Sequence, residues 1–263
     1  MTEQRACEIM EKTVINGSPH PNTLEYMDAL MISIDVLGAE YTREQLRNWI
    51  LVNKYPFLIP KHWDTDTMSY EVRRDYDYTW TELDAMPDGW RKAFGEMMCE
   101  EIKEELIKHN CLDEYLILDI KEKFGQLRWY DNGTPIGCNI SRIIENYSVL
   151  SENICIICGK PDVPMIGTLP SYISPFCKKC YSMPNFEYKE THSEDEIDAW
   201  TEAHKKKWEE FNNSQNNTMS DEYTVGTWRR NDETNEYETI TTTYNVSETA
   251  NKIRAKWRME HGE

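Results

Sequence analysis

The stretch NICIICGKPDVPMIGTLPSYISPFCKKCY, residues 153–181, holds half of the chain's eight cysteines in two Cys-x-x-Cys pairs. Cys155 and Cys158 form the first pair, and Cys177 and Cys180 follow after eighteen intervening residues. This spacing is typical of a zinc site with four thiolate ligands. Four thiolates saturate a tetrahedral zinc ion, so such a site stabilises a fold and leaves no position for water or substrate. The sequence therefore predicts a structural Zn²⁺ in a zinc ribbon.

The residues around the cysteines bear on this interpretation. Gly159 directly follows Cys158, and a chain that wraps around a metal often needs a positive φ there, which glycine adopts easily. Tyr181 stands at the matching position of the second pair, which therefore fits the pattern less well. The loop between the pairs is rich in Pro, Gly and Ser, so we expect the metal to supply much of its folding free energy. An iron–sulfur or rubredoxin-like iron site, a dithiol redox pair and unrelated cysteines are the alternatives.

The charge of the chain is acidic and unevenly distributed. Its 263 residues include 29 Lys and Arg against 47 Asp and Glu, for a net charge of −18. Residues 1–110 contribute −9 and residues 187–222 contribute −7, whereas residues 151–186 and 223–263 are close to neutral. Nucleic-acid affinity comes mainly from cationic groups that displace counterions from phosphates. The charge therefore predicts repulsion of nucleic acid and attraction of a basic partner.

The start of the chain indicates a cytoplasmic protein. The first residues, MTEQRACEIMEKTVINGS, carry charges throughout and contain no apolar run, which is untypical of a secretory signal or a membrane anchor. No later stretch approaches the roughly 20 apolar residues of a spanning helix. In a reducing compartment, paired cysteines hold metal more often than they form disulfides.

Capping and periodicity signals predict an α+β fold with a mainly helical N-terminal half. Asn22 with Glu25, and Thr42 with Gln45, resemble capping boxes that open two helices, and Pro87 begins the clearest helix of the chain. The alternating sequence YLILDIKEKFGQLRWYDNG predicts a β-hairpin. Its strands are expected at 115–121 and 126–130, further helices at 139–150, 193–211 and 247–261, and a second hairpin at 223–246 with its turn near 231–235.

These elements suggest five segments along the chain. They are a helical α+β domain over 1–150 with the hairpin at 115–130, the inserted zinc ribbon at 151–186, an acidic helix at 187–211, a polar linker at 212–222, and a C-terminal β-hairpin with a basic helix at 223–263. The linker is assigned because NNSQNNTMSD has almost nothing to bury.

One resemblance is specific. The succession KEKFGQLRWY at 121–130, a helix, CIICGKP at 155–161 and a later CKKC resembles an uncharacterised family found in phage and prophage genomes. Its members carry a Lys-Glu-Lys-Phe-Gly-x-Leu-Arg-x-Tyr strand motif shortly before a Cys-x-x-Cys-Gly ribbon. The likeness is specific over about 115–181, and the stretches 55–63 and 75–106 also resemble phage hypothetical proteins. It implies an origin more than an activity, and proteins of that origin often act on host machinery.

The leading hypothesis is a non-enzymatic, phage-derived protein that binds and blocks a host protein in the bacterial cytoplasm. A nucleic-acid-handling defence effector of the CRISPR kind would suit its charge, because such effectors carry basic grooves that an acidic protein can occupy. No direct contact with nucleic acid or a membrane is expected. The competing hypothesis is a nucleic-acid-binding regulator that uses the zinc ribbon, the hairpin and the basic final helix.

Three regions supply candidate partner-binding residues, and each has a simpler structural explanation. The candidates are Asp75, Asp77, Lys121, Lys123, Arg128, Trp129, Arg254 and Trp257. The acidic and aromatic stretch 70–80 would mimic a nucleic-acid backbone, or would be an edge strand with one solvated face. The basic residues of 121–130 would contact a phosphate or an acidic partner, or form a solvated strand face. The basic helix 247–261 would dock on a partner or nucleic acid, or pack on its own hairpin.

The sequence contains none of the motifs that would indicate an enzyme. The six histidines are dispersed without a His-Glu-x-x-His pattern, and no Gly-x-Ser-x-Gly or phosphate-binding glycine loop occurs. A hydrolase built from distant carboxylates stays open, because proximity in space is invisible in a sequence. Each of the remaining cysteines is expected to be a small buried apolar side chain. These are Cys7, Cys99, Cys111 and Cys138.

Overall fold

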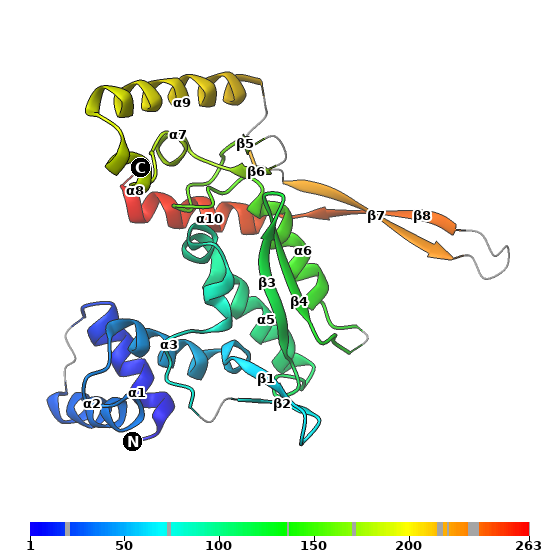
Figure 1. Ribbon diagram of the computed structural model, residues 1–263. Coiled ribbons are helices and arrows are strands. Elements are labelled where there is room, and N and C mark those ends of the chain that lie inside the picture. The colour runs from blue at the N-terminus through cyan, green and yellow to red at the C-terminus, as the bar shows by residue number, and fades with distance from the viewer. Residues whose placement is uncertain are drawn as a thin grey trace. The chain divides into compact units, whose positions relative to one another are not determined.

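A computed structural model describes residues 1–18, 22–72, 75–135, 137–169, 172–214, 218–219, 221–230 and 237–262. The chain is α+β, as predicted: helices predominate, and within the described residues the strands pair into two-stranded sheets (Figure 1). It divides into two compact units. Unit 1 comprises Met1–Ala85, Cys99–Ile120 and Trp129–Ile140, and unit 2 comprises Met86–Met98, Lys121–Arg128 and Ser141–Glu263. The five segments expected from the sequence follow other boundaries and stay a prediction.

Unit 1 begins with helices and a short hairpin. Its elements are α1 (Glu3–Met10) with a π-helical turn (Glu11–Ile15), α2 (Thr23–Leu37), α3 (Arg43–Lys54), a 3₁₀ turn (Pro56–Leu58), β1 (Lys61–Asp64), β2 (Ser69–Val72) and a second 3₁₀ turn (Glu82–Ala85). The capping box expected at Thr42 and Gln45 is present. At the start of α2 the Asn22 side chain accepts the N–H of Glu25 at 3.3 Å. Both helices therefore begin where the capping signals predict.

The first three helices of unit 1 share one core, and α2 contributes only part of its surface to it. Ala29 of α2 is fully buried against α1 and α3. In contrast, Leu24, Met27 and Met31 are 78%, 46% and 60% exposed, although the sequence places them on the same apolar face as Leu30. Spaced at i, i+3 and i+7, they lie on one side of the helix. We call these three side chains the α2 stripe.

The middle of the chain carries α4 (Asp88–Trp90), a π-helical turn (Arg91–Gly95), α5 (Glu96–Lys108), β3 (Ile117–Lys123), β4 (Gln126–Asp131) and α6 (Ile140–Ser151). The helix expected from Pro87 is therefore interrupted by a π turn. β3 begins and ends two residues later than expected. Phe124 and Gly125 join the strands with φ values of 55° and 78°. Two positive φ angles in a two-residue loop match the right-handed twist of the hairpin.

Unit 2 continues with β5 (Met165–Leu169), β6 (Tyr172–Pro175), α7 (Lys178–Tyr181), α8 (Phe186–Thr191), α9 (Glu194–Ser214), β7 (Glu222–Arg230), β8 (Tyr237–Asn245) and α10 (Ser247–His261). In Figure 1, α9 lies across α7, and the β7–β8 hairpin extends away from the rest of unit 2. Phe94 stacks on Tyr147 of α6 with ring centroids 5.2 Å apart. Trp90, fully buried, belongs to the same interior.

Two polar stretches, 212–221 and 70–80, differ in structure from what their sequences suggest. The tract expected as a linker begins inside α9, which runs on to Ser214, while residues 215–217 and 220 and the expected turn at 231–235 lie outside the described residues. The stretch 70–80 is not one edge strand, because β2 ends at Val72 and residues 75–80 form turns. Those turns are fixed by side chains of α3: Gln45 Nε2 donates to Asp77 O at 3.0 Å, and Asn48 Nδ2 donates to Tyr78 O at 2.9 Å. Side-chain hydrogen bonds from α3, rather than strand pairing, therefore satisfy these backbone carbonyls.

Candidate functional site

The structure brings the four cysteines of 153–181 together. The Sγ atoms of Cys155, Cys158, Cys177 and Cys180 all lie within 4.8 Å of one another, and Cys158 Sγ is 3.7 Å from Cys177 Sγ. A tetrahedral ion with metal–sulfur bonds of about 2.3 Å would hold its sulfurs about 3.8 Å apart. A disulfide needs a separation of about 2.0 Å, and all four cysteines are free. The donor set and spacing fit one metal ion, as the sequence predicted.

The two pairs reach the cluster by different local structures. After α6, Cys155 N donates to Lys160 O at 2.8 Å and Gly159 N donates to Cys155 O at 2.9 Å, with Gly159 at φ +85°. This turn is the first knuckle. The second pair opens α7, where Cys177 is the N-cap and its Sγ accepts the Cys180 N–H at 3.4 Å. A helix start needs no positive φ, which explains why Tyr181 can follow Cys180.

The first knuckle packs directly against α4. Gly89 N donates to Ile156 O at 2.9 Å, and the buried Trp90 Nε1 donates to Ile154 O at 2.8 Å. Gly89 has no room for a side chain, because a Cβ there would lie 2.1 Å from the carbonyl oxygen of Cys155. The cysteine turn is therefore part of the interior of unit 2, held by backbone and indole hydrogen bonds from a segment some 65 residues earlier.

The final helix packs against the same turn. Arg254 of α10 makes a two-pronged contact with Asp162, with Nε and Nη2 each 3.0 Å from a carboxylate oxygen, and its side chain is only 14% exposed. Lys256 Nζ donates to Lys92 O. Trp257 shares a small recess with Cys158 and stacks on His261, with ring centroids 3.6 Å apart. Arg254 and Trp257, expected to bind a partner, hold α10 against the ribbon, and their contact with a partner stays a prediction.

Four thiols this close cannot all ionise without a cation. The thiol of Cys155 lowers the pKa of Cys177 to about 7 by hydrogen bonding to it. Conversely, the hydrogen bond with Cys158 raises the pKa of Cys155, and burial adds to that rise. Some sulfurs ionise only if others keep their protons. A divalent cation would remove this conflict, because metal binding displaces the protons and neutralises the negative charge.

The other expected partner-binding residues differ in exposure. Lys121 and Lys123 are exposed, and Lys123 Nζ lies 5.6 Å from the centre of the Phe124 ring, whereas Arg128 is half-buried. Trp129 is only 5% exposed, and its Nε1 donates to Tyr115 Oη at 3.0 Å. An indole held this way belongs to the interior, so the assignment of Trp129 to a surface is corrected.

The acidic candidates lie in the turns after β2. Asp75 and Asp77 are both exposed. Asp77 Oδ1 accepts hydrogen bonds from Thr79 Oγ1 at 2.7 Å and from Thr79 N at 3.1 Å, and these bonds hold its pKa below the usual range. The carboxylate therefore stays charged while it shapes a turn. Whether either residue contacts a partner stays a prediction.

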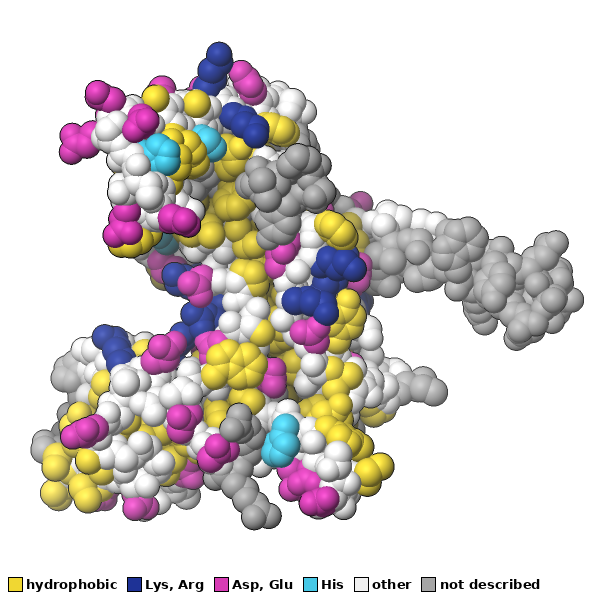
Figure 2. Space-filling view, viewed as in Figure 1, with side chains coloured by type: hydrophobic (Ala, Val, Ile, Leu, Met, Phe, Trp, Pro, Cys, Tyr) yellow, Lys and Arg dark blue, Asp and Glu magenta, His cyan; other side chains and the backbone are white. Residues whose placement is uncertain are grey.

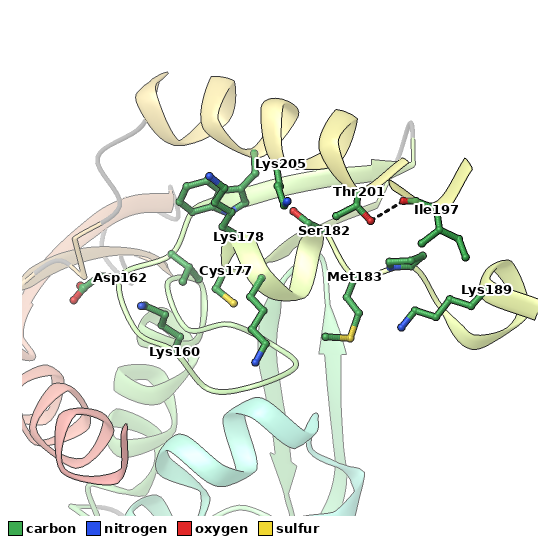
Figure 3. A pocket seen from close by; sticks show the side chains of 14 residues that line it. Lys160, Asp162, Cys177, Lys178, Ser182, Met183, Lys189, Ile197, Thr201 and Lys205 are labelled. Carbon is green, nitrogen blue, oxygen red and sulfur yellow. Dashed lines mark hydrogen bonds between the residues drawn. The ribbon is translucent and has the colours of Figure 1, made fainter. Parts of the chain in front are cut away.

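A cavity of about 730 Å³ adjoins the cysteine cluster at Cys177, and no sequence pattern predicted it (Figure 3). It lies between the ribbon and α9, which Trp208 Nε1 attaches by donating to Phe176 O at 2.8 Å. Apolar side chains form much of its lining. The lysines that line it are Lys160, Lys178, Lys179, Lys189 and Lys205. Figure 3 shows Lys160 and Lys189 on opposite sides, with Cys177 between them.

The charges around this cavity are only partly neutralised. Lys178 pairs with Glu209, and Lys205 pairs with Glu202 at 3.2 Å. In the described part of the chain, Lys179 and Lys189 have no ion-pair partner. Ser182, also in the lining, is 5% exposed, and its Oγ has no hydrogen-bond partner there. A cationic cavity with a buried, unsatisfied hydroxyl suits an anionic ligand.

Comparisons of the chain with protein-family models, with curated proteins and with solved structures give no match. No helix of the described residues is long and apolar enough to cross a membrane.

Proposed function

We propose that this chain is a non-enzymatic binding protein of phage origin that attaches to a host protein in the bacterial cytoplasm and inhibits it. The proposed partner handles nucleic acid through a basic surface, as a CRISPR effector does. The cysteine cluster would hold a structural Zn²⁺, because four thiolates leave no open coordination position for chemistry. The family resemblance of residues 115–181 supports the phage origin.

The observation that carries this proposal is the α2 stripe. Leu24, Met27 and Met31 are large apolar side chains left in solvent on a helix whose opposite side is packed. Apolar anchors at i, i+3 and i+7 are how an amphipathic helix enters a groove of another protein. Methionine adapts its shape to irregular partner surfaces. Nucleic acid offers little to such anchors, so the stripe favours a protein partner.

The charge beside the stripe indicates which kind of partner. Asp28 and Asp35 are exposed on the same helix. They belong to residues 1–110, which hold 21 acidic against 12 basic residues. Acidic side chains, magenta in Figure 2, are spread over the face of the molecule drawn there. A basic groove would gain long-range attraction from this surface and apolar contact from the stripe.

The test is capture of the partner from a bacterial lysate with the full chain as bait. The double variant Met27→Lys/Met31→Lys places cations where a basic groove would dock. Met259→Lys, at an 80% exposed position of α10, is the matched control. We expect the wild type and the control to capture the same basic, nucleic-acid-handling protein, and the stripe variant to lose it.

Two further measurements belong to this test. Association should weaken between about 0.05 and about 0.5 M salt, because exposed charges are screened over this range. The captured protein should also bind its nucleic acid less well when the chain is added. The proposal is contradicted if the stripe variant captures the partner as well as the wild type does, or if the affinity for the partner does not change with salt concentration.

The lysine-lined cavity favours a second candidate, a nucleic-acid-binding regulator. Lysine binds phosphate as a point charge. The cavity lies beside the cysteine cluster, and lysines from both the ribbon and the segment 187–222 line it. The discriminating measurement is fluorescence anisotropy with DNA and RNA at physiological salt. Binding that is lost in Lys179→Gln/Lys189→Gln, yet kept in Lys206→Gln on the exposed side of α9, would favour the regulator. Absence of binding would favour the protein inhibitor.

A further inference from the structure

A second group of metal-ligand side chains lies in unit 1. The ligand atoms of Glu105, His109 and Cys138 all lie within 4.8 Å of one another. Glu105 and His109 are four residues apart at the end of α5, and Cys138 lies just before α6. Cys138 is expected in the interior from its sequence, but it is half-exposed in the structure. The other three single cysteines are buried, as expected: Cys7, Cys99 and Cys111.

The distances suit a small cation. His109 Nε2 lies 3.1 Å from Glu105 Oε1. Nitrogen and oxygen ligands of a tetrahedral zinc ion, bound at about 2.0–2.1 Å, stand about 3.3 Å apart. The side chains of Glu105 and His109 are 12% and 24% exposed. They are therefore mostly sheltered, and solvent still reaches part of each side chain.

The neighbours of Glu105 orient it as outer-shell groups orient a metal ligand. Glu105 Oε1 accepts the backbone N–H of Asn139 at 2.9 Å and its Nδ2 at 3.1 Å. Lys108 Nζ lies 3.3 Å from Oε2. Hydrogen bonds to a ligating carboxylate fix its position, and such partners matter nearly as much as the ligands.

We propose that Glu105, His109 and Cys138 form a second metal site that binds Zn²⁺. A carboxylate, an imidazole and a thiolate together suit zinc better than they suit Mg²⁺ or Ca²⁺, which take oxygen ligands. With three protein ligands the ion keeps one position for water, unlike the saturated cysteine cluster. The ion would link the end of α5 to the segment before α6. It would thereby join the two ends of the segment 110–138, which contains β3 and β4.

The simpler explanation is that Glu105 only anchors Asn139 and contacts His109. Glu105→Gln distinguishes a metal site from this purely structural role. A glutamine oxygen still accepts the Asn139 hydrogen bonds but lacks the negative charge that binds a cation. His109→Gln and Cys138→Ser remove the other ligands without touching Asn139. His62→Gln, at an exposed position of β1, is the matched control.

The experiment is native mass spectrometry, with elemental analysis, of the full chain loaded with zinc and freed of excess metal. A phosphine reductant keeps Cys138 from forming a disulfide with the nearby Cys111. Each of the three ligand variants should carry one zinc ion fewer than the wild type, whereas His62→Gln carries the same number. Circular dichroism confirms that each variant compared is folded. Equal zinc content in the wild type and in folded Glu105→Gln and Cys138→Ser overturns the proposal, whatever the cysteine cluster holds.

Discussion

Replacing Gly89 by alanine should destabilise the metal centre from a distance. A Cβ at residue 89 would lie 2.1 Å from the carbonyl oxygen of Cys155 and 2.6 Å from the carbonyl carbon of Ile156. Carbon–oxygen contacts are comfortable from about 3.3 Å, so the first knuckle has to retreat by about 1.2 Å. Both obstructing atoms belong to the backbone, and no side chain can turn aside to relieve the clash.

The size of the effect follows from what the retreat disturbs. Overpacking in a well-packed interior costs about 1–3 kcal/mol. The same movement stretches the bond from Gly89 N to Ile156 O and draws Ile154 O away from Trp90 Nε1. A buried donor left without its acceptor costs about another 1–3 kcal/mol. We therefore expect Gly89→Ala to lower the free energy of unfolding of unit 2 by about 2–6 kcal/mol, a large share of a typical domain stability.

The assay is urea denaturation with zinc present, followed by tryptophan fluorescence, together with the rate of zinc transfer to a chromogenic chelator. Gly262→Ala is the matched control, because Gly262 also lies in unit 2, with φ +69° and no atom within 4 Å of a new Cβ. That variant should lose only the roughly 1 kcal/mol of a left-handed alanine. If Gly89→Ala unfolds within 1 kcal/mol of Gly262→Ala and releases zinc no faster, the first knuckle is not packed as described.

Three other variants probe the charges and the metal. Burial, with a smaller contribution from Asp119, raises the pKa of Glu82 to about 7, so the folded state is penalised once this group ionises. Glu82→Gln should therefore add stability at pH 8, by about 1–2 kcal/mol after allowance for partial hydration, and progressively less as the pH of the urea titration falls to about 5. Arg254→Met should destabilise unit 2 by about 1–3 kcal/mol, and a double-mutant cycle with Asp162→Asn should recover part of that loss. Cys158→Ser should release zinc and expose residues 153–181 to protease, whereas full zinc retention with an unchanged melting curve would contradict a structural metal.

Local signals predicted the elements well where the physics is local. Thr42 and Gln45 satisfy each other's backbone groups, so a helix start there needs no help from the rest of the chain. The cysteine spacing likewise predicted the cluster, because two Cys-x-x-Cys pairs can meet at one ion only in a few ways. The turn at the first cysteine pair and the helix start at the second depend on residues close to them in sequence, Gly159 and Cys177 respectively.

Tertiary contacts determine which of the amphipathic elements are buried, and the sequence does not show these contacts. Trp129 shares its strand face with Leu127, and both side chains are buried, with the Trp129 indole donating to Tyr115 in the interior. Arg254 and Trp257 lie on a helix whose sequence is typical of partner docking, yet the chain itself supplies the partner through Asp162 and the first knuckle. The sequence of a basic amphipathic helix does not show whether the helix packs against another molecule or against its own chain. The α2 stripe shows the reverse, since its apolar spacing suggests a buried face, yet no described residue of unit 1 covers it.

Net charge proved to be a poor guide to local electrostatics. The segment 187–222 carries −7, and this value predicts that α9 repels anions. Along the side of α9 that faces the ribbon, however, Lys205 and Trp208 line the cavity together with Lys178 and Lys179 of α7. At physiological ionic strength charges farther apart than about 8 Å are largely screened from one another, so a ligand in the cavity senses these lysines more than the carboxylates on the outer side of the helix. An acidic protein can therefore attract a basic partner over its surface and still present a cationic cavity beside its cysteine cluster.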